Sequence, residues 1–298
     1  MDTLTPRRDE PEVLPMAGDE FDRHRPFLIG LAYRMLGSSA EAEDAVQDTW
    51  LRWQSGDTRT IGDPRAWLST TIVRICIDRL KSARARRETY PGTWLPEPVL
   101  TTKPLDLESI QLGFLVLLER LDPRERAVFL LHQVFDYSHA EIGQMLELSE
   151  AASRQALHRA KKHVAEDRPR FVADRETHQR LLSAFLSAVS RGDVQAISSL
   201  IAEDVVLYGD HGKKERGAIL VPIFGREKVA RFFASQVAKM PSSHGLEVTI
   251  REVNGWPAVV GRRGESVAFV INLETNGQEI VTIRSVMNPQ KLALRSLD

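Results

Sequence analysis

The spacing of apolar residues changes once along the chain, near Glu176, and this change constrains the fold more than any other feature. Before it, apolar residues recur at intervals of three and four, as in residues 27–35, which is the period of an α-helix. After it, short runs of β-branched residues alternate with turn pairs such as Asn254-Gly255. The chain has 298 residues, enough for two or three domains. The sequence therefore predicts a multidomain protein in which helical domains precede an α+β domain.

Prolines set the predicted boundaries of these domains. Residues 1–18 combine several prolines with many charges, which is typical of a disordered tail. Residues 89–105 are too rich in proline for a helix, and we predict a linker there. The resulting division is a tail at 1–18, a helical domain at 19–88, the linker at 89–105, a second helical domain at 106–172 and the α+β domain at 176–298. In the last domain, helices are predicted at 177–191 and 193–201, and strands at 205–208, 246–253, 258–260, 266–273 and 280–286.

The composition excludes several classes of protein. With a net charge of −1, a nucleic-acid partner must be sought in local clusters of Lys and Arg. The single cysteine, Cys76, excludes a disulfide framework or a thiolate metal site within one chain. We therefore expect no metal, no cofactor and a cytoplasmic location. No stretch resembles a signal peptide or approaches the roughly 20 apolar residues that span a bilayer, so no membrane contact is expected.

Residues 138–164 have the pattern of a helix-turn-helix. Ser138 with Glu141 three residues later predicts a helix start, and a second helix follows a tight turn at 147–148. One face of that second helix is apolar, while the other carries side chains that bind base edges and phosphates in a major groove. A solvated basic face on an ordinary helical hairpin is the alternative. The candidate DNA contacts are Arg154, Gln155, His158, Arg159 and Lys162.

A second cluster of cations, at residues 74–87, has only Asp78 as an opposing charge and therefore favours a polyanion. Trp67 and Thr70 precede it, and aromatic rings beside cations suit melted DNA, whose exposed bases stack. The alternative is that Trp67 belongs to the core. The candidate DNA contacts are Trp67, Thr70, Arg74, Arg79 and Lys81.

Taken together, these segments resemble the extracytoplasmic-function (ECF) sigma factors. Residues 31–37, 42–52 and 64–80 resemble region 2 of that family, which opens and holds the minus-ten promoter element. Residues 121–161 resemble region 4, which recognises the minus-thirty-five element. The match covers about residues 21–170, and the order and spacing of its motifs make it specific. The resemblance implies that the partners are promoter DNA and core RNA polymerase, the latter bound through its β′ and β subunits. It also implies that the protein is not an enzyme.

The resemblance also assigns roles by position. An acidic face at residues 39–53 would by itself indicate only a solvated surface. In the family this helix binds the coiled coil of the β′ subunit, which implies polymerase contacts at Asp44, Gln47, Asp48 and Leu51. The resemblance assigns the basic helix to the minus-ten element and the helix-turn-helix to the minus-thirty-five element. Arg74 departs from the pattern, because many members carry an Asn there.

Three further motifs resemble those of the SigJ-like subgroup, whose C-terminal domain is SnoaL-like (NTF2-like) and cone-shaped. They are residues 94–98 in the linker, residues 288–292, and residues 210–214, where His211 and Lys213 replace two glycines. Because the linker is semi-rigid and apolar, we expect this domain to cover it and so to regulate the sigma regions in cis, with no separate anti-sigma factor required. A small ligand in its pocket is a further candidate partner. The residues implied in the interdomain contact are Trp94, Pro96, Asp210, Lys214, Asn288, Pro289, Lys291 and Leu292.

Two other classes of function fit parts of the sequence. One is a DNA-binding module fused to a SnoaL-like enzyme, with Asp210 or His211 as general base. The other is a repressor with a ligand-sensing domain. The first helical domain discriminates among them, because only a sigma factor needs an acidic helix for the polymerase followed by a separate basic helix.

Overall fold

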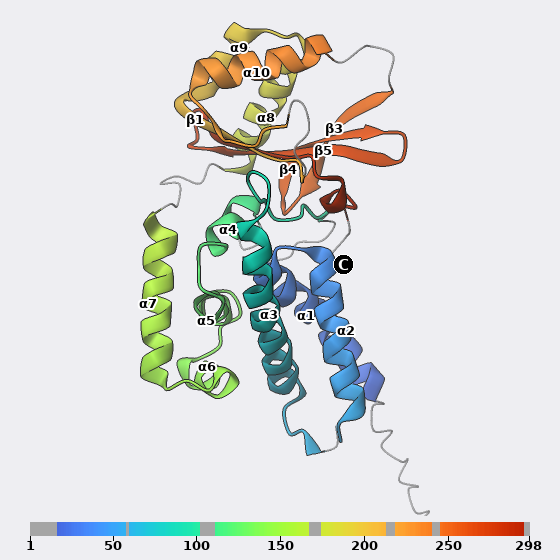
Figure 1. Cartoon of the computed structure of the whole chain (residues 1–298), viewed down its shortest axis with the longest axis vertical. Helices are drawn as coiled ribbons and strands as arrows, with labels where there is room; N and C mark the ends of the chain where they lie inside the picture. The colour runs from blue at the N-terminus through green and yellow to red at the C-terminus, as the bar shows by residue number, and fades with distance from the viewer. Residues whose placement is uncertain are drawn as a thin grey trace, which may run out of the picture.

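The computed structural model describes residues 17–57, 60–101, 111–166, 174–212, 218–239 and 245–294. Nearly all of the predicted tail lies outside these residues. The long helices α1 (Ala17–Leu36), α2 (Ser39–Ser55) and α3 (Pro64–Glu88) pack side by side. The shorter helices α4 (Leu112–Leu118), α5 (Pro123–Gln133), α6 (His139–Leu146) and α7 (Glu150–Glu166) lie beside them (Figure 1).

The two groups of helices share one apolar core, to which Leu31, Ile72 and Leu131 all contribute fully buried side chains. Arg126 on α5 adds a polar link, because its buried guanidinium donates to the carbonyl of Met35 at 2.6 Å, near the end of α1. The predicted helical domains are therefore packed against each other.

Local chemistry sets the helix ends around the functional segments. Asp63 Oδ1 accepts the amide of Ala66 at 3.0 Å in the first turn of α3. The turn between α6 and α7 is close because Glu147 has a positive φ of 57° and because Gly143 has no side chain. A Cβ on Gly143 would lie 2.7 Å from the carbonyl oxygen of Leu148. Any larger residue at position 143 would push the two helices apart.

The C-terminal part is the predicted α+β domain. It contains the helices α8 (Arg175–Ser190), α9 (Val194–Leu200) and α10 (Arg226–Lys239), of which α10 was not predicted. The strands are β1 (Ile201–Asp210), β2 (Ile223–Phe224), β3 (Leu246–Val253), β4 (Trp256–Arg263), β5 (Ser266–Thr275) and β6 (Ile280–Val286), and a short 3-10 helix, η3, spans Pro289–Lys291. They form one sheet in the order β2-β1-β6-β5-β4-β3, in which β1 and β6 are parallel and the other neighbours antiparallel.

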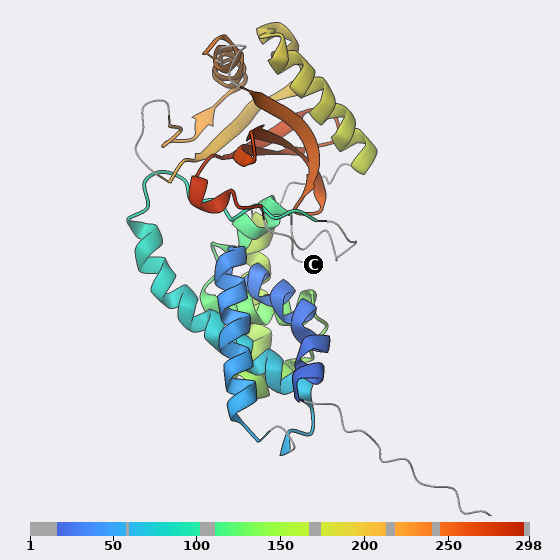
Figure 2. The ribbon, with the colours of Figure 1, turned by 90° about the vertical axis from the view of Figure 1, so that its right-hand side faces the viewer.

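The sheet is strongly curved, and its two faces have different partners (Figure 2). Helices α8, α9 and α10 cover one face, where Leu207, Phe233 and Ile283 form a second core. The other face of the sheet is turned toward helices α1–α7. On that side Val260 and Val286 pack with Leu95 of the linker. The predicted fold class, helical domains followed by a cone-shaped α+β domain, is confirmed. Among the residues that the structure describes, no helix is long and apolar enough to cross a membrane.

Candidate functional site

The exposed face of α7 carries the side chains predicted to contact the minus-thirty-five element. Ser138 and Glu141 form a capping box at the start of α6, in which the Ser138 amide donates to Glu141 at 2.7 Å. Leu157, Ala160 and Val164 bury one face of α7 against the core. The opposite face therefore points outward and exposes Arg154, Gln155, His158, Arg159 and Lys162.

The two arginines on this face have partners within the protein. Arg154 pairs with Glu150 at 2.9 Å, one turn earlier on the helix, where both side chains are exposed. Arg159 Nε donates to Glu125 on α5 at 2.6 Å, and that carboxylate is only 12% exposed. Exposed helical pairs stabilise by only a few tenths of a kcal/mol, about 0.3–0.5 kcal/mol. Arg154 is therefore easily released from its pair, whereas Arg159 is tied to α5.

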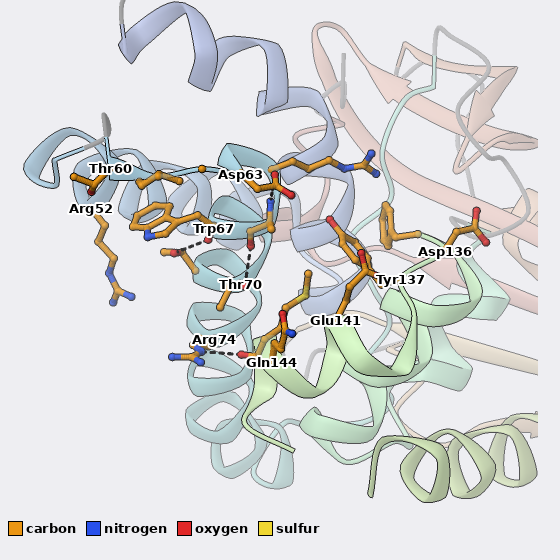
Figure 3. A pocket seen from close by; sticks show the side chains of 17 residues that line it. Arg52, Thr60, Asp63, Trp67, Thr70, Arg74, Asp136, Tyr137, Glu141 and Gln144 are labelled. Carbon is orange, nitrogen blue, oxygen red and sulfur yellow. Dashed lines mark hydrogen bonds between the residues drawn. The ribbon is translucent and has the colours of Figure 1, made fainter. Parts of the chain in front are cut away.

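A groove of about 1150 Å³ separates the first half of α3 from the helix-turn-helix (Figure 3). Trp67, Thr70 and Arg74 line the α3 side, and Gln144 and Met145 line the other. The half-buried ring of Trp67 packs against the core, and its centroid lies 5.5 Å from that of Trp53. The arrangement offers an aromatic surface and a cation to a nucleic-acid base and its phosphate.

Contacts across one end of this groove hold α3 to the helix-turn-helix. Arg74 Nε donates to the carbonyl of Met145 at 2.9 Å, and its guanidinium pairs with Glu147 at 2.9 Å. The hydroxyls of Ser69 and Tyr137, both buried, lie 2.8 Å apart. The predicted minus-ten surface is therefore partly covered by region 4 in this structure.

Arg79 and Lys81, the other predicted minus-ten contacts, do not line the groove. Arg79 turns toward α2, where it pairs with Asp48 at 2.7 Å and donates to the carbonyl of Glu41 at 3.0 Å. Lys81 pairs with Asp78 at 3.0 Å on the exposed face of α3. Among the described cations of this cluster, Arg74 thus lines the groove, Arg79 contacts α2 and Lys81 lies on the exposed face of α3.

The predicted polymerase-binding residues share one face of α2. Asp44, Gln47 and Leu51 are exposed, and Asp48 beside them is half-exposed because of its pair with Arg79. Leu51 is 53% exposed, which makes it one of the few large apolar side chains on the surface. An exposed leucine among carboxylates suits a partner that is basic and partly apolar.

A buried polar cluster joins the linker to the C-terminal domain; we call it the Asp210 cluster (Tyr90, Leu95, Asp210, Asn288 and Lys291). The Asp210 carboxylate is fully buried at the end of β1 and accepts from Tyr90 Oη, from the amide of Leu95 at 2.9 Å and from Lys291 Nζ at 2.7 Å. Lys291 also donates to the carbonyl of Leu95 at 2.5 Å, and Asn288 donates to Tyr90 Oη at 2.9 Å. Burial and the bond to Asp210 raise the pKa of Tyr90, so it stays a neutral donor.

The cluster brings together most of the residues implied in the interdomain contact. The Lys291 ammonium lies over the Trp94 ring, 4.1 Å from the ring centroid. Leu292 is buried in the apolar cluster that also contains Leu95, Val260 and Val286. Pro289 begins η3, whose cap is the Asn288 side chain. Pro96 is buried in the linker next to Gly37. Lys214 lies outside the described residues.

Glu97 fixes the linker to the sigma region and was not singled out from the sequence. Its carboxylate, 4% exposed, accepts from the amide of Ser39 at 3.0 Å and from the hydroxyls of Ser38 at 2.9 Å and Ser39 at 2.5 Å. These groups form the N-terminus of α2, where the helix dipole favours a negative charge. Gly37 permits this approach, since it has a φ of 69° and a Cβ there would lie 3.0 Å from the Trp94 ring.

A histidine at the start of the helix-turn-helix, His139, has a testable effect on stability. The rings of His132 and His139 lie 4.4 Å apart, and His139 Nδ1 is 2.9 Å from Ser153 Oγ on α7. Burial lowers the pKa of His139 below its usual value, with smaller effects of the same sign from His132, Arg154 and Lys161, while Glu150 acts in the opposite sense.

A histidine whose pKa is lower in the folded state contributes stability above its unfolded pKa of about 6.5, and this contribution is lost as the pH falls below that value. We therefore expect the urea midpoint of the helical part to fall between pH 7.5 and 5.5. His139→Asn, which keeps a polar atom near Nδ1, should show a smaller fall. An equal fall of the urea midpoint in the unmodified chain and in His139→Asn would contradict this role of His139. The control is His158→Asn, because His158 is exposed.

Comparisons with known proteins identify two sigma-factor regions in the chain. The model of Sigma-70 region 2 matches residues 21–86, and that of Sigma-70, region 4 matches residues 112–164. The chain is 41% identical over 293 residues to ECF RNA polymerase sigma factor SigJ of Mycobacterium tuberculosis, covering 93% of each protein. It is 29% identical over 277 residues to the probable ECF RNA polymerase sigma factor SigI of the same species, covering 90% of this chain and 92% of SigI.

A solved structure supports the same relationship. The crystal structure of Mycobacterium tuberculosis SigJ matches with a TM-score of 0.73 and 32% identity, covering 94% of this chain and 99% of the SigJ chain. The similarity thus extends over both helical regions, the linker and the α+β domain. The chain therefore belongs to the ECF sigma factors, which direct RNA polymerase to promoters.

Proposed function

We propose that this sigma factor uses three separate surfaces: the exposed face of α2 for the β′ subunit, the α3 side of the groove for the minus-ten element, and the exposed face of α7 for the minus-thirty-five element. Region 4 would also contact the β subunit, and the protein would act in the cytoplasm with the polymerase. The observation that carries the proposal is the separation of an exposed acidic and apolar face on α2 from an exposed basic face on α7.

A run-off transcription assay with purified core polymerase tests this function directly. We expect a transcript that requires the chain and that depends on both promoter elements of the template. Transcription that is independent of the minus-thirty-five sequence would contradict the role given to α7. Absence of any transcript with a polymerase that other ECF sigma factors activate would favour the alternative of a DNA-binding regulator.

The α7 surface predicts that Arg154→Ala and Lys162→Ala behave differently. Loss of a bidentate contact from Arg154 to a base should cost about 1–3 kcal/mol and relax the preference at one position of the element. Loss of a phosphate contact from Lys162 should weaken all sequences alike and reduce the salt dependence. Selection from a randomised promoter library measures both. An unchanged base preference for Arg154→Ala would assign that side chain to the backbone only.

The closed contact between α3 and the helix-turn-helix suggests that promoter binding requires the two regions to separate. Two nitrogens of Arg74 already bind Met145 and Glu147 on region 4, so those donors become available to DNA only when the two regions separate. The linker sets how far they separate, and the Asp210 cluster holds the linker. We therefore assign the C-terminal domain the role of a regulator in cis, which makes a separate anti-sigma factor unnecessary. Tethering supports this role, because short links give millimolar effective concentrations and so keep even weak contacts occupied.

The alternative of a fused enzyme gains no support from the proposed general base. Asp210 has no exposed surface, and three donors already occupy its carboxylate. His211 Nδ1 accepts the amide of Ile219 at 3.3 Å. Asp210 thus serves the contact with the linker, and His211 a contact within its own loop.

A further inference from the structure

The turn between β3 and β4 reaches from the C-terminal domain into the sigma region. Asn254 at this turn is 1% exposed and has a positive φ of 53°, which Asn tolerates better than most residues. Its amide nitrogen Nδ2 donates to the hydroxyl of Tyr33 at 2.6 Å, and its Oδ1 accepts the amide of Val99 at 3.2 Å. The turn therefore contacts both α1 and the linker through one side chain.

Tyr33 connects Asn254 to Glu97 through two hydrogen bonds of its hydroxyl. The Tyr33 side chain is fully buried, and its hydroxyl donates to the carbonyl of Glu97 at 2.7 Å while it accepts from Asn254. Burial raises the pKa of Tyr33, so the hydroxyl keeps the proton that it donates. The Glu97 amide in turn donates to the carbonyl of Gly37 at 2.8 Å. Both backbone groups of Glu97 are therefore held at the corner between α1 and α2.

The held carboxylate of Glu97 accepts the first amide of α2, that of Ser39. This bond fixes the first turn of α2, whose buried face is also packed against α1 and α3, so its loss would let that end of the helix shift. The residues proposed for the polymerase follow within one to four turns of that end. A hydrogen-bonded path therefore runs from the C-terminal domain through Asn254, Tyr33 and Glu97 to the helix that would bind the polymerase.

We infer that Asn254 is a positioning residue for polymerase binding: its amide holds Tyr33 and Glu97 so that α2 presents its face in the binding orientation. This inference rests on the proposed assignment of α2 to the polymerase. It is independent of the Asp210 cluster, which holds the other end of the linker. It also gives the C-terminal domain a direct influence on polymerase affinity, in addition to any influence on promoter spacing.

The test is Asn254→Gly in the full-length chain. Glycine keeps the positive φ of the turn and removes only the side-chain bonds. The matched control is Asn276→Gly, the same change at the Asn-Gly turn between β5 and β6, where the side chain accepts from the amides of Gln278 and Glu279 within its own turn. Two quantities are measured: the affinity for core polymerase, and the hydrogen exchange of the first turn of α2, where Ser39 donates to Glu97.

We expect Asn254→Gly and Tyr33→Phe each to weaken polymerase binding about fivefold, the equivalent of one net hydrogen bond, and to speed exchange at the start of α2. Asn276→Gly should change neither quantity. In a chain that already carries Glu97→Gln, Asn254→Gly should have a smaller effect, because the carboxylate that it positions is gone.

Unchanged affinity and unchanged exchange in folded Asn254→Gly would overturn the inference, as would equal losses for Asn254→Gly and Asn276→Gly. Charge reversal at Asp44 and Asp48 separates this failure from failure of the proposed function. If the reversal weakens polymerase binding while Asn254→Gly does not, only the positioning role is wrong. If neither change affects binding, α2 is not the polymerase contact, and the positioning role falls with it.

Discussion

Asp210→Ala is expected to release the linker from the C-terminal domain. The carboxylate is fully buried, and the Lys291 side chain that it neutralises is only 12% exposed. Removal of one partner from a buried ion pair costs about 3–5 kcal/mol, because the remaining charge is left without compensation. The amide of Leu95 and the hydroxyl of Tyr90 lose their acceptor in the same change. This is the largest stability effect that the interdomain contacts predict.

The release is measured by urea unfolding of the full-length chain and by proteolysis within the linker. The matched control is Asp204→Ala, since Asp204 is an exposed carboxylate on the same strand. Addition of Lys291→Met to Asp210→Ala should recover part of the loss, because no buried charge then remains. If the C-terminal domain regulates in cis, the Asp210→Ala protein should also change transcription from its promoters. Equal midpoints for Asp210→Ala and Asp204→Ala would show that the cluster does not hold the linker.

Charge reversal at both Asp44 and Asp48 is expected to have the largest effect on polymerase binding. The two carboxylates lie on the exposed face of α2, where complementary charge would orient a basic partner. Reversal places like charges opposite each other, which costs several kcal/mol, so we expect a loss in affinity of about 100-fold. The loss should be smaller at high salt, since screening weakens interactions between exposed charges.

Asp48 needs a separate control because it also pairs with Arg79. Asp48→Lys places a second cation beside that guanidinium and disturbs the contact between α2 and α3. Asp44→Lys alone tests the surface without that disturbance, and Asp204→Lys controls for the change in net charge. Binding of labelled protein to core polymerase, with circular dichroism as the check on folding, gives the result. Normal co-purification of the doubly reversed protein with the polymerase would remove α2 from the interface.

The sequence by itself determined the local elements and their order. Ser138 and Glu141 define the start of α6 because a capping box needs only residues three positions apart, and the apolar period of α7 decides which of its side chains face outward. Strands β1, β3, β4, β5 and β6 were likewise predicted from runs of strand-type residues between turns, whereas the short β2 was not. Helix α10 was missed, although its buried Val229, Ala230 and Phe233 recur at the helical spacing of three and four. The subgroup motifs, including Asp210 and Lys291, came from resemblance.

Only the tertiary structure decided which of these residues meet. Asn254 and Tyr33 are 221 positions apart, and no local pattern relates a turn asparagine to a helical tyrosine. A glutamate such as Glu97 is usually expected to be exposed to solvent. It binds the N-terminus of α2 only because the linker folds back onto that helix. Arg79 was expected to face DNA as part of a basic cluster, yet the packing of α3 on α2 places it against Asp48. Periodicity fixes what each helix buries, whereas the partner of a long polar side chain depends on how whole elements pack.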